Sequence, residues 1–378
     1  EIAILREHVR TQTMTHRARR NKKRPEGWAI AQKLYNNLQP SDLLQRHRWL
    51  FTKQWVDYSG EERFEEKLDH AARDRWVSEE RAKALREVQT ALGHEGIFQL
   101  CALGDASHLI GWTLSREVMS REELLDFLVA AMNGSAHCDQ SKLDQSISGV
   151  LRQLAEDQLE DFLSDAAQMH GEKDRSEALM RLHMLAPFDR KNWDLVAKLG
   201  DEAERQYWQK INVGWSGFAD DDLNFCVERL MAVDRPRAAF SVAHYDYKKL
   251  KTETLTNLLH EMATKDTEPS GYYMPQSHDI IDAFNALEKR DDADPSKLAR
   301  LEFMYVRAIG SHSGFPFSNL SREVASSPQT FFHFVALCFR RDDHGPDDAE
   351  LGLPTNAEQI RNAAQMAYSA LGVVRRMP

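Results

Sequence analysis

Apolar side chains recur along most of the chain at the three- and four-residue spacing of an amphipathic helix. The clearest run predicts one long helix that starts near residue 142 and ends at Gly171. Its apolar face consists of Leu143, Ile147, Val150, Leu151, Leu154, Phe162 and Leu163. Similar spacing predicts helices around residues 223–231, 255–262 and 280–287. The chain is therefore expected to be almost wholly α-helical.

Residues typical of helix ends occur where this spacing begins and stops. Ser120 and Glu123 have the sequence of a capping box, and Asn133-Gly134 supplies a stop after the apolar face that follows. Residues 220–222 are three aspartates, whose carboxylates suit the positive end of a helix dipole. These signals predict helices that start near residues 120 and 220.

Two prolines mark further starts, because Asp294 and Ser327 each place a capping side chain before a first-turn proline. The expected helices begin near residues 120, 142, 176, 191, 201, 220, 236, 252, 275, 295, 328 and 356. An interval of about 20 residues is typical of one half of a helix hairpin in a solenoid repeat. Neither the tetratricopeptide nor the ankyrin pattern recurs, so we predict an all-α fold, a superhelical array of degenerate, HEAT- or TPR-like helix pairs.

The length of 378 residues exceeds the usual size of one compact domain. Hydrophobic residues make up 42% of the chain and charged residues 29%, which suits a folded protein. Three regions are expected: a basic helical segment at 1–26, an N-terminal helical region at 27–134 and a C-terminal helical-repeat region at 135–378. The chain opens on Glu1 inside a helical pattern, which predicts a piece of a longer polypeptide, although a trimmed tag gives the same start.

The four cysteines are far apart and form no C-x-x-C pair, so they match neither a disulfide framework nor a zinc site. We find no run of 18 apolar residues and no export signal. These observations predict a protein of the cytoplasm with no membrane partner.

Charge is distributed unevenly along the chain. Residues 1–26 carry a net charge of +5, whereas the whole chain has a net charge of −10. Six basic side chains form a cluster, namely Arg17, Arg19, Arg20, Lys22, Lys23 and Arg24. Such a cluster can contact phosphates, but it has no aromatic residue on which a base could stack. We favour a solvated helix face for it and keep nucleic-acid binding as the alternative.

The common nucleotide-binding, metalloprotease and hydrolase motifs are missing from the sequence, which weighs against an enzyme. The run His137-Cys138-Asp139 has metal-binding side chains, yet consecutive loop residues rarely converge on one ion. Residues 311–313 (Ser-His-Ser) offer a nucleophile and a base without a group to orient them. We interpret both as ordinary loop residues, and we expect no metal and no cofactor.

Three loops between predicted helices share glycine and aromatic residues, at 214–218, 271–275 and 313–317. Loops of helix-pair arrays lie along common edges, so aromatic loops on one edge can form a binding surface with large anchors. The candidate binding residues are Trp215, Phe218, Tyr272, Tyr273, Phe315 and Phe317. The competing interpretation, which we favour, is that these rings fold back over the ends of the core.

Two pairs of segments resemble parts of very large bacterial proteins with long helical C-terminal regions. The first pair is Leu38–Leu43 with Arg46–Phe51, and the second is Leu298–Phe303 with Pro328–Phe332. Some such proteins are similar to NTPase-linked, defence-type multidomain proteins, in which an effector and a nucleotide switch precede a helical sensor. The resemblance implies a recognition or scaffold role and transfers no nucleotide-binding or effector residue.

The leading hypothesis is a non-enzymatic helical-repeat scaffold or sensor region that binds a protein partner or another domain of its parent chain. The first alternative is a nucleic-acid-binding helical array that uses the basic N-terminal segment. The second alternative is an enzyme with an unrecognised helical active site.

Overall fold

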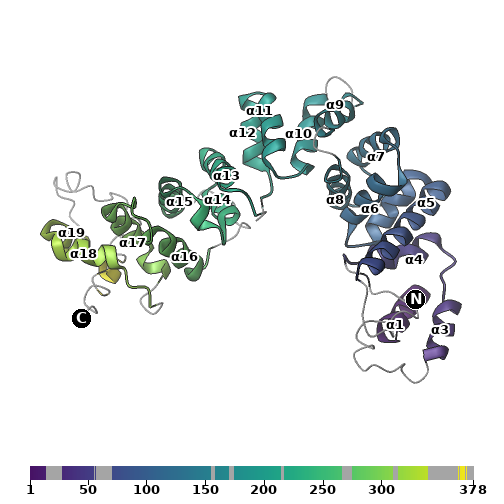
Figure 1. Cartoon of the computed structure of the whole chain (residues 1–378), viewed down its shortest axis with the longest axis horizontal. Coiled ribbons are helices and arrows are strands. Elements are labelled where there is room, and N and C mark those ends of the chain that lie inside the picture. The colour runs from purple at the N-terminus through teal and green to yellow at the C-terminus, as the bar shows by residue number, and fades with distance from the viewer. Residues whose placement is uncertain are drawn as a thin grey trace. The chain divides into compact units, whose positions relative to one another are not determined.

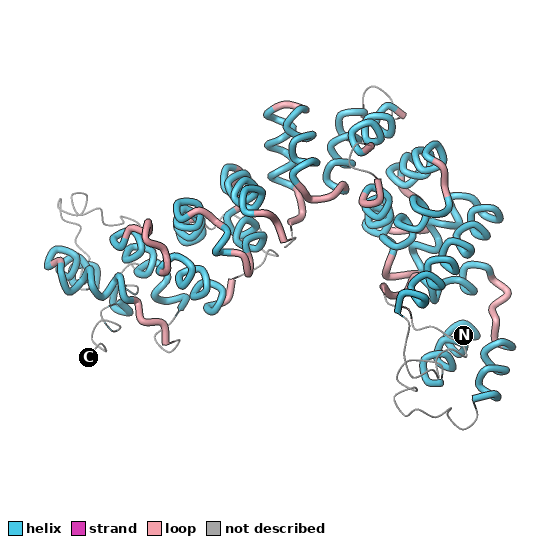
Figure 2. The backbone as a smooth tube through the Cα atoms, in the orientation of Figure 1, coloured by secondary structure: helices cyan, strands magenta, loops and turns pink. Residues whose placement is uncertain are grey.

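A computed structural model describes the chain at residues 1–13, 28–54, 56, 70–154, 158–169, 174–213, 217–265, 275–309, 314–338, 365, 367–370 and 372. These residues form helices joined by short loops and contain no strand (Figure 1 and Figure 2). Their one extended pairing is an isolated bridge between Ser135 and Cys138. The predicted all-α class is confirmed.

The chain divides into two compact units, Glu1–Ala203 and Glu204–Pro378. The boundary expected after residue 134 falls inside the first unit, because the helices on either side of it pack against each other. A loop rich in polar residues therefore does not mark a division here. In the described part of the chain, none of the helices is both long and apolar enough to cross a membrane.

The first unit begins with helices α1 (Ile2–Thr13) and α3 (Trp28–Asn37), which pack on each other. The elements that follow are α4 (Leu43–His47), η1 (Arg48–Leu50), α5 (His70–Leu103), α6 (Ser107–Thr113), the π-helical η3 (Leu114–Val118), α7 (Arg121–Asn133), α8 (Gln140–Leu151), α9 (Leu159–Gln168), α10 (Arg175–Leu185) and α11 (Arg190–Lys198). Helix α5 bends at Gly93, whose backbone angles (φ 63°, ψ −158°) are accessible almost only to glycine.

Helix α12 (Asp201–Lys210) crosses the division between the units. The second unit continues with α13 (Asp220–Ala232), α14 (Pro236–Ala243), η4 (Tyr247–Lys249), α15 (Thr252–Thr264), α16 (Ser277–Glu288), α17 (Pro295–Ile309), α18 (Ser318–Ser326) and α19 (Pro328–Cys338). From α13 to α19 each α-helix contacts the next.

Capping side chains determine several of the helix starts, as the sequence predicted. The Ser120 side chain accepts from the backbone of Glu123, and the Glu123 side chain accepts from the backbone of Ser120, so the capping box exists. Asp294 and Ser327 accept backbone N–H groups at the starts of α17 and α19. The first turn of α13 carries the three aspartates. Short-range capping was therefore readable from sequence.

The single long helix expected from residue 142 to Gly171 is wrong. The chain forms α8 and α9 instead, with residues 152–158 between them outside any helix that the structure describes. The apolar spacing stays in phase from Leu154 to Phe162, so periodicity alone could not separate the two helices. Glu160 and Asp161, which lie in the first turn of α9, were the signal for a new start. Helix α18 was also missed.

The centre of the first unit is a close crossing of α6 and α8. An added Cβ atom at Gly111 would lie 1.8 Å from the carbonyl oxygen of Ser146, and one at Gly149 would lie 2.0 Å from that of His108. Two glycines thus let the helix backbones touch. Around them, one continuous core joins α4 to α10, and it includes Phe51, which is fully buried.

In the second unit, large aromatic side chains fill the core and polar side chains tie helix ends together. Trp208, Phe240 and Phe284 are fully buried. The hydroxyl of Tyr305 donates to the Leu259 carbonyl at 2.7 Å, which fixes α17 against α15. The loops between these helices therefore connect elements whose positions are fixed by the core and by hydrogen bonds.

Candidate protein-binding site

The aromatic loops predicted as a binding surface are not exposed where the structure describes them. Phe218, Phe315 and Phe317 are buried, and Phe315 meets Phe317 edge to face at 4.9 Å between ring centroids. Phe315 also packs on Phe284 of α16, with ring centroids 5.6 Å apart. The prediction that these three residues are exposed anchors is therefore wrong, because burying a ring is more favourable than leaving it in water. Their rings cover the core.

The remaining sequence candidates lie outside the described residues. These are the loop aromatics Trp215, Tyr272 and Tyr273, the run 311–313, and the basic cluster Arg17, Arg19, Arg20, Lys22, Lys23 and Arg24. The predictions made for them stay predictions.

Four aromatic residues that the sequence did not indicate as exposed are exposed in the structure, Tyr245, Phe331, Phe332 and Tyr368, and Tyr245 is the most exposed of them. The ring of Tyr245 is 79% exposed, although its backbone adopts a left-handed conformation (φ 69°). Helix α14 ends at Ala243, His244 is its C-cap, and Tyr245 follows at the position where a left-handed glycine usually ends a helix. The N–H of Asp246 closes the turn on the Ala243 carbonyl at 2.9 Å. An aromatic residue here carries a backbone cost of about 1–2 kcal/mol.

The Tyr245 ring stacks on its neighbour His244, with ring centroids 3.7 Å apart and planes 23° from parallel. His244 in turn is fixed from the other side, because its Nε2 lies 2.9 Å from Oδ1 of Asp279. Asp279 belongs to the first turn of α16 and is only 2% exposed. A buried carboxylate thus orients the imidazole, and the imidazole supports the exposed ring.

Asp279 is held by two further contacts. Its Oδ2 accepts the backbone N–H of Gln276 at 2.8 Å, which makes the carboxylate part of a capping box. Nε2 of the exposed His278 lies 3.2 Å from Oδ1. The negative carboxylate sits at the N-terminus of α16, which agrees with the helix dipole. We call Tyr245, His244, Asp279 and His278 the Tyr245 cluster.

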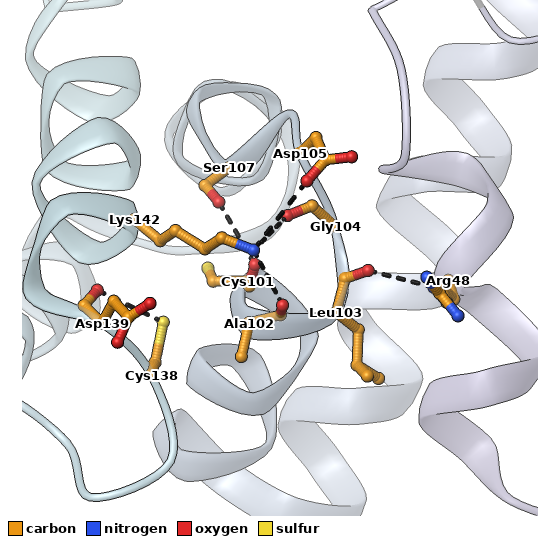
Figure 3. A network of polar contacts seen from close by, with 10 residues as sticks. All are labelled: Arg48, Cys101, Ala102, Leu103, Gly104, Asp105, Ser107, Cys138, Asp139 and Lys142. Atoms are coloured by element: carbon orange, nitrogen blue, oxygen red, sulfur yellow. Dashed lines mark hydrogen bonds and ion pairs between the residues drawn. The ribbon is translucent and has the colours of Figure 1, made fainter.

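The first unit contains a second polar network, in which side-chain donors are paired with backbone carbonyls (Figure 3). Lys142 on α8 reaches the end of α5, where its Nζ donates to the carbonyls of Ala102 and Gly104, both at 2.8 Å. Nε of Arg48 donates to the Leu103 carbonyl between them at 3.0 Å. Two cations therefore satisfy the last carbonyls of one helix, which are negative by virtue of the helix dipole.

Two cysteines belong to the same network (Figure 3). Burial raises the pKa of the Cys101 thiol to about 12, and burial also raises the pKa of Cys138. Because the thiolate is the nucleophile, both thiols are held in their unreactive form at neutral pH. The network clamps α5 to its neighbours and presents no reactive group.

Two further observations concern ligand and metal binding. A cavity of about 570 Å³ between α13 and α15 is lined by residues of both charge signs, Glu228, Met231, Lys251, Thr252, Glu253, Thr254, Asn257 and Asp292. The hydroxyls of Thr252 and Thr254 already donate to Asp292 and Glu228. Among the described residues, no group of three or more His, Cys, Asp or Glu side chains could hold a metal ion. Neither feature selects a ligand.

The sequence carries a local signal for the position of Tyr245 but none for its partners. Pro236 marks the start of a short helix, and a tyrosine that follows the end of such a helix without a glycine has to adopt the strained position itself. The pairing of His244 with Asp279 links residues 35 positions apart, which no local pattern indicates.

No family model matches the chain, and neither a curated protein nor a solved structure matches it.

Proposed function

We propose that the chain is a helical-repeat scaffold or sensor region that binds a protein partner, or another domain of its parent chain, and that Tyr245 anchors this contact. The observation that carries the proposal is an exposed ring held rigidly at a strained backbone position. Strained backbone persists where the surrounding structure fixes it, and such positions cluster at functional sites. Tyrosine is also among the residues that dominate binding energy at protein interfaces.

The groups around the ring favour a protein over a nucleic acid. The Asp279 carboxylate lies 2.9 Å from His244, and the Asp246 carboxylate is paired with Lys249 at 3.2 Å, so acids and bases balance beside the ring instead of forming the basic patch that phosphate contacts require. The imidazoles of His244 and His278 both contact Asp279 beside the exposed ring, so polar groups border an aromatic anchor, as at the rim of a protein interface.

The test is site-specific photo-crosslinking in cells, with a photoreactive phenylalanine analogue at position 245. The matched control places the same analogue at position 368, because Tyr368 is a comparably exposed tyrosine (74%) elsewhere in the second unit. We expect one defined protein adduct at 245 that is absent at 368. Equal labelling at both positions, or no adduct at 245, contradicts the proposal.

The identified partner is then purified, and its affinity is measured for two variants. Tyr245→Ala should weaken binding by more than about tenfold with the melting temperature unchanged, whereas Tyr368→Ala should leave the affinity within about twofold. Electrophoretic mobility with and without residues 1–26 tests the nucleic-acid alternative. A shift of DNA or RNA that disappears on removing those residues favours the alternative over the protein partner.

A further inference from the structure

The Tyr245 cluster contains two imidazoles that meet one carboxylate oxygen. Oδ1 of Asp279 lies 2.9 Å from Nε2 of His244 and 3.2 Å from Nε2 of His278. The His244 contact has the geometry of a hydrogen bond, which a neutral imidazole makes by donating its N–H. The His278 contact is an ion pair, so its attraction depends on a proton on that imidazole. The two histidines therefore have different roles.

The groups of this cluster also differ in their access to water. The side chain of Asp279 is 2% exposed, whereas the side chain of His278 is 71% exposed. Burying a charge is unfavourable unless an opposite charge or hydrogen bonds compensate it. A proton on His278 places a positive charge beside the buried carboxylate, and solvent can deliver that proton directly.

A partner that binds Tyr245 also covers His278. Both imidazoles contact the same oxygen atom, so His278 lies beside the His244 ring on which Tyr245 stacks. A standard interface buries about 800 Å² on each partner, which is far more than one side chain provides. Covering the cluster removes water from the Asp279 carboxylate, and a positive charge next to it is then worth more than in the uncovered chain.

We infer that His278 is a proton-dependent switch of the partner contact, which tightens as this imidazole becomes protonated. The inference rests on the proposed function of Tyr245. Histidine is the side chain whose charge ordinarily changes between about pH 5 and pH 8. If the complex holds the proton more tightly than the uncovered chain does, binding takes up a proton and the affinity rises as pH falls.

Other charged groups stand on the elements packed around His278. Helix α16 contacts η4, α15 and α17. Carboxylates, amines and guanidinium groups ordinarily keep their charge between about pH 5 and pH 8, so they add a field that stays constant over this range. The variable charge of the cluster is therefore on its imidazoles. The charged residues of the neighbouring segments include Asp246, Lys248, Lys249, Glu261, Asp282, Arg290 and Arg307.

The test is isothermal titration calorimetry of the whole chain with the protein that crosslinks at position 245. Titrations between about pH 5.5 and pH 8, each in two buffers of different ionisation enthalpy, give the affinity and the number of protons taken up. We expect the affinity to rise on the order of tenfold toward the acid end, with uptake of a proton.

The variant His278→Gln should bind with an affinity that is nearly constant over this pH range and with little proton uptake. His260→Gln is the matched control, because His260 is an exposed histidine on α15 of the same unit, and it should behave like the unaltered chain. The partner's own titration is the same in each experiment, so the difference between the variants isolates His278. Proton uptake by His278→Gln equal to that of the unaltered chain overturns the inference.

A second variant tests the other half of the ion pair. Asp279→Asn removes the negative charge and retains the size of the side chain, so it should also abolish the pH dependence, and circular dichroism checks its fold. If it unfolds, the exposed position 278 still decides. Tyr245→Ala separates the two proposals. If it weakens binding while His278→Gln leaves the pH dependence unchanged, the inference fails and the proposed function stands. If Tyr245→Ala binds like the unaltered chain, the proposed function fails.

Discussion

Both units tie helix ends with polar side chains, but the first unit also has a close helix crossing made by backbones. In the first unit, α6 and α8 touch through glycine, and the contact is between backbones. In the second unit, helix ends are tied by polar side chains, such as Arg235, which donates to the carbonyls of Trp208 and Ile211 at the end of α12. A backbone contact tolerates no added atom, whereas a polar clamp tolerates conservative replacement. The difference predicts how each unit fails.

The largest effect is expected at the glycine crossing. Gly111→Ala should reduce the free energy of unfolding of the first unit by more than about 3 kcal/mol, because the new Cβ meets the Ser146 carbonyl, which belongs to another helix backbone. Urea titration followed by tryptophan fluorescence and local hydrogen exchange measures the loss. Gln145→Ala, an exposed change on α8, should stay within about 0.5 kcal/mol. Equal stability of both variants would show that the crossing is looser than the geometry requires.

The second effect concerns the cationic clamp of the first unit. Lys142→Met should cost about 2 kcal/mol, because it leaves the carbonyls of Ala102 and Gly104 without their charged donor. Lys198→Met is the matched control: its partner Glu160 is exposed, and an exposed pair contributes about 0–1 kcal/mol. If the two losses are the same, the Lys142 clamp contributes no more than an exposed ion pair does.

The third effect separates backbone strain from packing at Tyr245. Tyr245→Gly and Tyr245→Ala both remove the ring, but only glycine adopts the left-handed conformation without cost. The glycine variant should therefore be more stable than the alanine variant by about 1 kcal/mol in thermal or urea unfolding. A glycine variant that is no more stable than the alanine variant would mean that the backbone relaxes and that Tyr245 is not held under strain.

Sequence reasoning succeeded where the determining contacts are local. The helix starts at Ser120, Asp294 and Ser327 depend on side chains that reach only two or three residues along the chain. For Phe315 and Phe317 it left an exposed surface and a cover over the core as alternatives and favoured the cover, which agrees with their burial. It could not decide between the two, because the Phe315 ring packs on Phe284, a residue about 30 positions away.

The binding candidates show the same limit. Glycine and aromatic residues in a loop are compatible both with an exposed surface and with a cap on the core, and only the tertiary contacts distinguish the two. The exposed tyrosine was missed for the converse reason, since it stands in a segment without the expected loop composition. Side-chain exposure in a helical array therefore has to be established from packing.

The smallest of the four effects is expected at Glu302. Its contribution to the free energy of unfolding depends on pH. This carboxylate is fully buried on α17 and accepts the backbone N–H groups of Asn319 and Leu320 at the start of α18. Burial raises its pKa in spite of these hydrogen bonds. The folded state thus holds the proton more tightly than the unfolded state does. Stability contributed by this group is present below the unfolded value of about 4.3 and declines as pH rises to the raised folded pKa.

Replacing the carboxyl with an amide removes this pH dependence. Glu302→Gln also replaces one hydrogen-bond acceptor, which adds a pH-independent difference in unfolding free energy between the two proteins. The informative quantity is therefore how this difference varies with pH. Relative to the unaltered chain, the variant should gain stability as pH rises from about 4 through the raised folded pKa, and the difference should then level off. Urea titrations of the second unit at several pH values measure it. A pH-independent difference would mean that the folded and unfolded states bind the Glu302 proton equally, which contradicts a folded pKa raised by burial.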